Sequence, residues 1–217
     1  MNGGLRLACN KERWQEVLRQ TTTAHSFGLQ MELLSAKEAQ DLWPIMDIED
    51  VHGAAFLPTD GQANPTDISQ ALAKGAKNNG AQILEETRVR NIILDDGIIT
   101  GVETDKGIVN CEKLVCCCGQ WSRQFAETVG VNIPLVSFQH QYMVTEQIEG
   151  VASNLPTLRD PDRLIYFKEE VGGLVMGGYE PNPISWAEKF VPEDFHFSLL
   201  DSDYDHFELI MNSALVR

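Results

Sequence analysis

The residues Leu114-Val-Cys-Cys-Cys-Gly-Gln-Trp-Ser-Arg-Gln-Phe-Ala-Glu-Thr-Val129 carry the clearest fold signal in the chain. Residues 114–118 form a short apolar run typical of a buried strand, Gly119 ends it, and a helix is predicted over 122–129. A glycine between strand and helix lets a ligand approach the backbone closely. Nucleotides bind at this carboxyl edge in open α/β sheets, so the stretch is a candidate nucleotide site. Trp121 can pack either on a planar cofactor or in the core.

The preceding residues predict helices alternating with strands. Asn10 is placed to cap a helix, and Ser35 with Glu38 forms a capping box before a second one. Strands are expected at 52–57 and 81–84, with a helix over 68–77 between them. A three-stranded meander is expected from residues 89–94, 98–104 and 108–111, with Asp95-Asp96-Gly97 as its first turn.

The pattern changes after residue 133. Residues 136–145 alternate in polarity and predict a strand with side chains on both faces. Residues 164–168 and 174–178 flank a Gly-Gly turn and predict a hairpin, and residues 201–217 predict an amphipathic helix. The fold class is therefore α/β (α+β).

Composition limits the classes of function. Seventeen basic and thirty-two acidic residues among 217 give a net charge of −15, which argues against a nucleic-acid partner. Apolar residues make up 43% of the chain, as expected for a folded protein. No apolar run reaches the roughly 20 residues that cross a bilayer. A soluble, acidic protein without a membrane span is predicted.

The five cysteines indicate a reducing compartment, either the cytoplasm or the mitochondrial matrix. Cys116, Cys117 and Cys118 are consecutive, so neighbouring side chains point to opposite faces of a strand and pair poorly. They are interpreted as small residues filling a buried strand. The spacing of Cys and His fits no zinc site, and no metal is predicted.

Residues 53–217 resemble the flavin-dependent amine oxidoreductases of the D-amino-acid-oxidase superfamily, most closely the dimethylglycine and sarcosine dehydrogenases. Gly3-Gly-Leu-Arg-Leu-Ala8 is similar to the family strand that precedes this region, which extends the resemblance to nearly the whole chain. The order and spacing of the matching stretches carry the resemblance. They are Pro58-Thr-Asp-Gly-Gln-Ala-Asn-Pro65, Gly80-Ala-Gln-Ile-Leu-Glu-Glu-Thr-Arg-Val89, Gly101-Val-Glu-Thr-Asp-Lys-Gly107, Cys118-Gly-Gln-Trp121, His140-Gln-Tyr-Met-Val-Thr-Glu146, Leu158-Arg-Asp-Pro161 and Gly177-Gly-Tyr-Glu180.

The resemblance implies FAD as cofactor and assigns candidate residues to it. Val89 matches a valine whose backbone lies against the adenine end of the flavin nucleotide, and Gly119 and Trp121 match the cofactor-proximal G-x-W motif. His140 matches a histidine near the reacting amine. A tyrosine on the following hairpin positions the substrate, with Tyr166 the first candidate.

Tyr179 is the second candidate for that tyrosine. The resemblance implies a small N-methylated amino acid as substrate and either an electron-transfer flavoprotein or oxygen as electron acceptor. Hydride transfer to flavin needs an unprotonated amine, and a histidine titrating near neutral pH can take its proton. Arg159 and Arg163 are candidates by charge for a carboxylate anchor, although a solvated loop would explain both.

The resemblance also implies two interleaved parts. Residues 62–133 would form part of an incomplete, Rossmann-like FAD-binding domain, to which the helix at 203–217 returns. Residues 1–61 and 134–202 would form a substrate-binding domain around a mixed sheet. The phosphate-cradling motif G-x-G-x-x-G does not occur in the sequence, so these residues are interpreted as the inner portion of a larger flavoprotein, inactive and unable to hold flavin tightly alone.

Two alternatives remain open from the sequence. One is a non-catalytic homologue of the kind that regulates pyruvate dehydrogenase phosphatase. The other is an amino-acid oxidase of the same superfamily acting on a different amine, such as glycine or proline. Retention of the H-x-Y-x-V-T-E pattern from His140 to Glu146 favours the amine-oxidising enzyme over the non-catalytic homologue.

Overall fold

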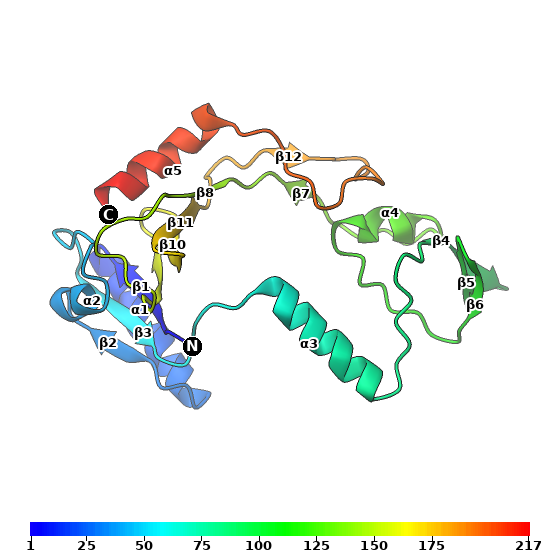
Figure 1. Ribbon diagram of the computed structural model, residues 1–217, viewed down its shortest axis with the longest axis horizontal. Helices are drawn as coiled ribbons and strands as arrows, with labels where there is room; N and C mark the ends of the chain where they lie inside the picture. Colours follow the sequence, from blue (N-terminus) through cyan, green and yellow to red (C-terminus); the bar gives the residue numbers. More distant parts are fainter. The chain divides into compact units, whose positions relative to one another are not determined.

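The computed structural model describes residues 1–217, whose contacts divide the chain into two compact units (Figure 1). Each unit combines segments that are far apart in the sequence. Unit 1 contains Met1–Asn64, His140–Pro183 and Asp201–Arg217, and unit 2 contains Pro65–Gln139 and Ile184–Leu200.

Unit 1 is built on a seven-stranded mixed sheet with the order β2-β3-β1-β9-β10-β11-β8. Its central pair, β1 and β9, is parallel, and every other neighbouring pair is antiparallel. The mixed sheet agrees with the predicted fold class. The strands are β1 (Gly4–Ala8), β2 (Glu32–Leu34), β3 (Gly53–Leu57), β8 (Tyr142–Val144), β9 (Thr157–Asp160), β10 (Ile165–Glu170) and β11 (Gly173–Gly178).

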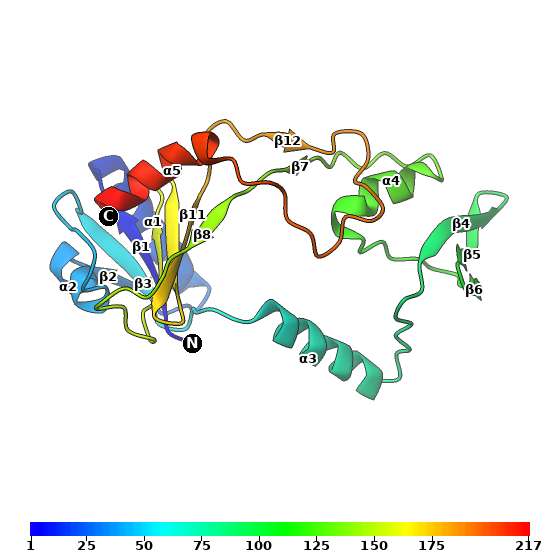
Figure 2. The same cartoon turned by 45° about the horizontal axis from the view of Figure 1, so that its top comes forward.

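One face of this sheet holds the main apolar core. Helices α2 (Ala36–Leu42) and α5 (Tyr204–Val216) supply buried side chains to it. Figure 2 shows α5 running beside β11. A Cβ atom at Gly178 would lie 2.6 Å from Ile210 Cδ1, so α5 packs directly on the backbone of β11. Each fully buried aliphatic side chain contributes about 1.5–3 kcal/mol. The sheet residues of this core include Leu5, Leu7, Ala54, Leu158, Ile165, Phe167, Leu174 and Met176.

The opposite face of the sheet is covered differently. Helix α1 (Lys11–Ser26) packs Val17 against Ala8 and Ala55, which forms a second, smaller core. Trp14 lies so close to Gly53 that a Cβ there would approach its ring to 2.7 Å. The core therefore splits between the two faces.

Local capping signals are confirmed in unit 1. Asn10 Oδ1 accepts the Arg13 amide at 2.8 Å at the start of α1. Ser35 and Glu38 form the reciprocal capping box of α2. Asp203 caps α5 by accepting the His206 amide at 2.9 Å. Each such cap contributes about 1 kcal/mol.

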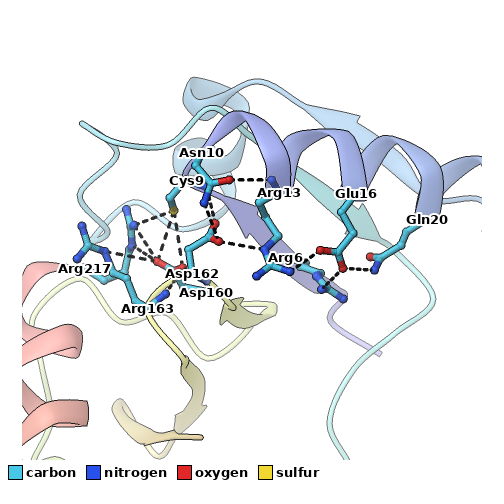
Figure 3. Close-up of polar contacts among 10 residues, drawn as sticks. All are labelled: Arg6, Cys9, Asn10, Arg13, Glu16, Gln20, Asp160, Asp162, Arg163 and Arg217. Atoms are coloured by element: carbon cyan, nitrogen blue, oxygen red, sulfur yellow. Dashed lines mark hydrogen bonds and ion pairs between the residues drawn. The ribbon is translucent and has the colours of Figure 1, made fainter. Parts of the chain in front are cut away.

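A buried ion-pair network joins the ends of β1, β9 and α5 (Figure 3). The Asp160 side chain is fully buried, and its Oδ2 atom lies 2.8 Å from Nη2 of Arg217. Asp50 pairs with Arg217 at 2.9 Å and with Arg163 at 2.6 Å. Because each buried charge has an opposite charge beside it, the network ties the last residue of the chain to the central strands.

Unit 2 contains the predicted meander. Strands β4 (Val89–Asp95), β5 (Ile98–Thr104) and β6 (Gly107–Asn110) pair in sequence order, all antiparallel. Asp96 and Gly97 both have positive φ angles, 49° and 78°, as a type I′ turn requires. The hairpin signal is therefore confirmed.

The other elements of unit 2 are short, apart from helix α3 (Pro65–Asn78), none of whose residues is buried. A 3-10 turn, Gly119–Trp121, leads into α4 (Ser122–Glu127). Strands β7 (Ser137–Phe138) and β12 (Ser185–Trp186) form a two-stranded sheet. The predicted continuous strand over 136–145 is therefore interrupted, with β7 in unit 2 and β8 in unit 1.

Two predicted strands are wrong. Residues 81–84 and 114–118 pair with no other strand. A strand forms only where a neighbouring strand accepts and donates its backbone hydrogen bonds, so neither segment is a strand here. Cys116, Cys117 and Cys118 are exposed, so their interpretation as core-filling residues is also wrong in this structure.

The contact-based units differ from the predicted domains at their boundaries, since residues 62–64 belong to unit 1 and residues 134–139 to unit 2, and in two longer segments. Helix α5 packs on the large sheet of unit 1, through Phe207 and Ile210, instead of returning to the meander. Residues 184–200 group with unit 2 instead of with the mixed sheet. No helix has the length and apolar character needed to cross a membrane.

Candidate active site and cofactor pocket

A row of polar and aromatic side chains crosses the face of the unit 1 sheet on which α1 packs, and it extends beyond α1 onto the open part of that face. In the strand register, Arg6 on β1 lies beside Arg159 on β9, and Arg159 lies beside Tyr166 on β10. Tyr166 in turn pairs with Gly177 on β11, which pairs with Tyr142 on β8. Paired residues in neighbouring strands point to the same face of a sheet. Strands from both ends of unit 1 therefore bring these side chains together.

The three predicted catalytic residues meet on this face. His140 Nε2 lies 3.0 Å from the Tyr166 hydroxyl oxygen, within hydrogen-bonding distance. The ring of Tyr179 lies 6.0 Å from that of His140 and 5.8 Å from that of Tyr166, measured between centroids. The sequence thus selected three residues that form one cluster, although their roles in catalysis stay predictions.

Gly177 makes room for this cluster. A Cβ atom at position 177 would lie 2.3 Å from the Tyr166 hydroxyl oxygen, closer than any real contact. The Tyr166 ring therefore occupies the space that a side chain at position 177 would take. Gly177 leaves space for the Tyr166 ring on one face of β11, and Gly178 leaves space for α5 on the other.

Burial keeps the Tyr166 hydroxyl protonated. Burial of the side chain, together with the nearby Tyr179, Glu180 and Tyr142, raises the pKa of Tyr166 above its ordinary value. A phenol whose pKa is raised stays neutral at physiological pH and acts as a hydrogen-bond donor and acceptor, not as a phenolate.

Glu180 and Arg159 also belong to the cluster. Glu180 was not among the residues proposed from the sequence. Its carboxylate lies 3.5 Å from His140 Nδ1, and its side chain is only 6% exposed. Its place in the Gly177-Gly-Tyr-Glu180 stretch, directly after Tyr179, is the only signal that could have found it. Arg159 stacks its guanidinium 4.9 Å above the Tyr179 ring.

The structure distinguishes the two candidate carboxylate anchors. Arg163 is engaged by Asp50 and Asp160 in the buried network. Arg159 is exposed and has no acidic partner. Of the two, only Arg159 has a guanidinium available to an anion.

The three predicted cofactor residues lie together in unit 2. Val89, Gly119 and Trp121 line one pocket of about 1210 Å³, with Phe125 and Phe190 among its apolar neighbours. The Trp121 indole donates to the Pro192 carbonyl at 3.3 Å, which holds the ring in the pocket wall. The predicted cofactor and catalytic groups therefore fall in different compact units.

The pocket fits the nucleotide part of a flavin cofactor. Gly119 has a positive φ of 55°, and open space lies where its Cβ would be, so a ligand can reach the backbone there. Aromatic walls suit a planar ring. Arg88, Arg90 and Glu193 also line the pocket, and because both arginines pair with Glu193, the three side chains carry one net positive charge. Val89, Gly119 and Trp121 are thus the residues that could hold FAD.

Cys9, Asp160 and Asp162 form the one group of possible metal ligands. The Arg217 guanidinium already lies among them, 3.2 Å from Cys9 Sγ and 2.8 Å from Asp160 Oδ2. Asp162 also pairs with Arg13 at 3.0 Å. Because guanidinium groups neutralise these carboxylates, the group is explained as part of the ion-pair network.

We expect the cysteines to differ strongly in reactivity, because the thiolate is the nucleophile. The backbone N–H of Cys118, with the Ser122 hydroxyl, lowers the pKa of the exposed Cys116 thiol. Burial and then Asp160 raise the pKa of Cys9 to about 12. At pH 8, iodoacetamide should therefore label Cys116 well before Cys9, as followed by peptide mass spectrometry. Labelling in urea is the control, and equal rates without urea would contradict the expectation.

Known proteins are similar to this chain along nearly its whole length. The sequence matches the FAD dependent oxidoreductase family (DAO) over residues 1–215. Mitochondrial sarcosine dehydrogenase of Homo sapiens is 36% identical to this chain, with an alignment covering 100% of the chain and 24% of that protein. Mitochondrial dimethylglycine dehydrogenase of Homo sapiens is 30% identical, covering 98% and 26%.

A relative without an oxidoreductase name is about as similar. The mitochondrial pyruvate dehydrogenase phosphatase regulatory subunit of Mus musculus is 34% identical over 99% of this chain and 25% of its own length. The chain therefore spans about a quarter of the length of each of these three relatives.

Among solved structures, L-proline dehydrogenase from P. horikoshii superposes with a TM-score of 0.81 at 25% identity. The match covers 98% of this chain and 54% of that protein. The family model, the named relatives and this solved structure thus match along nearly the whole chain. The chain belongs to the FAD dependent oxidoreductase family, DAO.

Proposed function

We propose that this chain is part of an FAD-dependent enzyme that oxidises the C–N bond of a small N-methylated amino acid. The observation that carries the proposal is the cluster of His140, Tyr166 and Tyr179 beside an unpaired Arg159 on the open sheet face. A cationic anchor next to neutral hydrogen-bonding groups suits a substrate that carries both a carboxylate and an amine. The names of the sarcosine and dimethylglycine dehydrogenases support this substrate class.

Each residue of the cluster has a distinct proposed role. Arg159 binds the substrate carboxylate, and Tyr179, stacked against it, limits its side-chain positions. His140 and Tyr166 take up the amine proton, because only a neutral amine readily loses hydride from its N-methyl carbon. FAD, when bound, accepts that hydride equivalent. Val89, Gly119 and Trp121 would hold the cofactor.

Other parts of the proposal rest on the relatives. An electron-transfer flavoprotein or oxygen would reoxidise the cofactor, and a reducing compartment such as the mitochondrial matrix or the cytoplasm suits the five free cysteines. The curated relatives named above are mitochondrial by name, which favours the matrix.

Turnover with a panel of amines tests the function. The full-length enzyme of which this chain is proposed to be part, loaded with flavin, is the protein to test. Its flavin should bleach anaerobically with sarcosine or dimethylglycine, with release of formaldehyde, and glycine and L-proline are the comparison substrates. Bleaching only by glycine or proline would assign a different oxidase of the same superfamily. Retained flavin with no bleaching by any amine would contradict the enzyme and favour the regulatory alternative.

We expect Arg159→Met to raise KM for the amino acid about 10- to 100-fold, because a charged hydrogen bond contributes about 1.5–3 kcal/mol. Methionine keeps the length of the side chain and removes its charge. Steady-state kinetics measures the change, and Arg19→Met, on the exposed side of α1, is the matched control. An unchanged KM in Arg159→Met would rule out this residue as the anchor.

A further inference from the structure

We propose that Glu180 is a positioning residue for His140, which makes Glu180, His140 and Tyr166 a three-member proton relay. The inference deepens the proposed function and assigns the relay to amine deprotonation. It rests on an unusual carboxylate: the Glu180 side chain is almost completely buried, and the His140 ring is its only ion-pair partner.

The surroundings of Glu180 identify that partner. Its side chain is 6% exposed, and no hydrogen bond from a backbone N–H or another side chain reaches it. A buried carboxylate needs a donor or a positive charge nearby to offset its lost hydration. His140 Nδ1, at 3.5 Å, is the group placed to provide it.

This contact decides which nitrogen of His140 carries the proton. A carboxylate accepts and cannot donate when ionised, so it favours the tautomer with the proton on Nδ1. Nε2 then presents its lone pair, and the atom 3.0 Å from it is the Tyr166 hydroxyl oxygen. With this tautomer, Tyr166 donates to His140 and keeps oxygen lone pairs free for the substrate.

The relay moves one proton over two hydrogen bonds. The substrate ammonium N–H bond breaks as its proton passes to the Tyr166 oxygen, and the original Tyr166 O–H bond breaks as that proton passes to His140 Nε2. The imidazolium that results lies between the Glu180 carboxylate and the neutral tyrosine. Atoms and charge balance: the substrate becomes a neutral amine, Tyr166 is unchanged, and His140 holds the proton.

Other charged and titratable groups near the relay leave Glu180 as the only carboxylate in contact with His140. Tyr179 lies against the His140 ring, and Tyr142 affects Tyr166 from β8. Arg159, the cation of this face, stacks on Tyr179. The positive charge of protonated His140 is therefore offset by Glu180 specifically.

Glu180→Leu tests the inference because it removes the acceptor at similar volume. In the 217-residue chain labelled with ¹⁵N-histidine, the ring shifts of His140 should move from the Nδ1–H tautomer to a mixture. In the flavin-loaded protein, kcat for N-methyl amino-acid oxidation should fall about 10- to 100-fold with KM changed less than about twofold, as for other residues that orient a reacting group. Glu170→Leu, an exposed residue of the same hairpin, is the matched control.

A double variant separates positioning from a general structural effect. If Glu180 acts through His140, His140→Ala with Glu180→Leu has the same rate as His140→Ala alone. A further loss in the double variant, or unchanged His140 shifts in Glu180→Leu, would overturn the proposal.

Glu180→Gln keeps the test decisive if the leucine variant does not fold. Glutamine can face His140 with either its oxygen or its amide nitrogen, and only the oxygen favours the tautomer with the proton on Nδ1. The rate of amine oxidation should therefore follow the fraction of His140 in that tautomer, which the ring shifts report. A rate that does not follow this fraction would also overturn the proposal. The proposed function can fail separately. If the flavin-loaded full-length wild type oxidises no amine while the His140 ring shifts still depend on Glu180, amine oxidation is contradicted and the Glu180–His140 contact is not.

Discussion

His140→Ala is expected to lower the rate of amine oxidation about 100- to 10,000-fold, the usual contribution of a positioned general base. The physical reason is the position of His140 at the centre of the cluster, 3.0 Å from Tyr166 and 3.5 Å from Glu180. Without the imidazole, the amine proton has no acceptor beyond Tyr166, whose raised pKa keeps it protonated. Anaerobic stopped-flow reduction of the flavin measures the chemical step directly.

Flavin content separates a catalytic role of His140 from a structural one. The predicted cofactor residues lie in unit 2, and His140 lies in unit 1, so flavin absorbance per protein should stay near that of the wild type. His52→Ala is the control, because His52 is an exposed histidine of unit 1. Equal losses of flavin and rate in His140→Ala would identify the residue as structural.

The rate should partly recover when the substrate amine is already neutral. His140→Ala is therefore expected to gain activity as the pH rises toward the pKa of the substrate amine, more steeply than the wild-type protein. A pH profile of flavin reduction over this range tests the proton-acceptor role separately from substrate binding.

Asp160→Ala is expected to destabilise unit 1 by about 3–5 kcal/mol, the usual result of removing one partner of a buried ion pair. Asp160 is fully buried, and the Arg217 side chain paired with it is 1% exposed. The variant leaves this guanidinium buried, with Asp50 as its remaining carboxylate. Asp160 Oδ1 also accepts the backbone amides of Asp162 and Arg163 at 3.1 Å, so the turn after β9 loses its anchor as well.

Urea denaturation followed by tryptophan fluorescence measures this loss, with the slope of the transition checked for two-state behaviour. Asp160→Asn keeps the acceptor for the turn amides and removes the charge, so it should fall between the wild type and Asp160→Ala. Asp41→Ala is the control: its pair with Lys37 is more than half exposed, and such pairs contribute about 0–1 kcal/mol. A loss in Asp160→Ala no larger than this control would mean that solvent reaches the network.

Much of the fold followed from short-range patterns. The caps at Asn10 and Ser35 and the turn at Asp96-Gly97 form as predicted because each depends on contacts within three or four residues. The hairpin of β10 and β11 follows the same logic, with positive φ at Val171 and Gly172.

Strand pairing could not be predicted in the same way. Residues 114–118 have the composition of a buried strand, yet they pair with no strand of this chain and Cys116 is exposed. Composition indicates that a segment can form a strand, whereas hydrogen bonds to a neighbour decide whether it does. The return of α5 to the large sheet was missed for a similar reason, since its apolar face fits either unit.

The sequence by itself determined the family, the cofactor class and the local caps and turns, and it predicted His140, Tyr166 and Tyr179, which the structure brings into one cluster. Tertiary structure alone decided that Arg159 is free while Arg163 is paired, and that Glu180 meets His140 across 40 positions of sequence. The physical reason is the distance along the chain over which each interaction acts. Caps, turns and motif spacings depend on neighbours along the chain, whereas the partner of a charged side chain depends on which strands lie side by side, and the register of β9, β10 and β11 sets that.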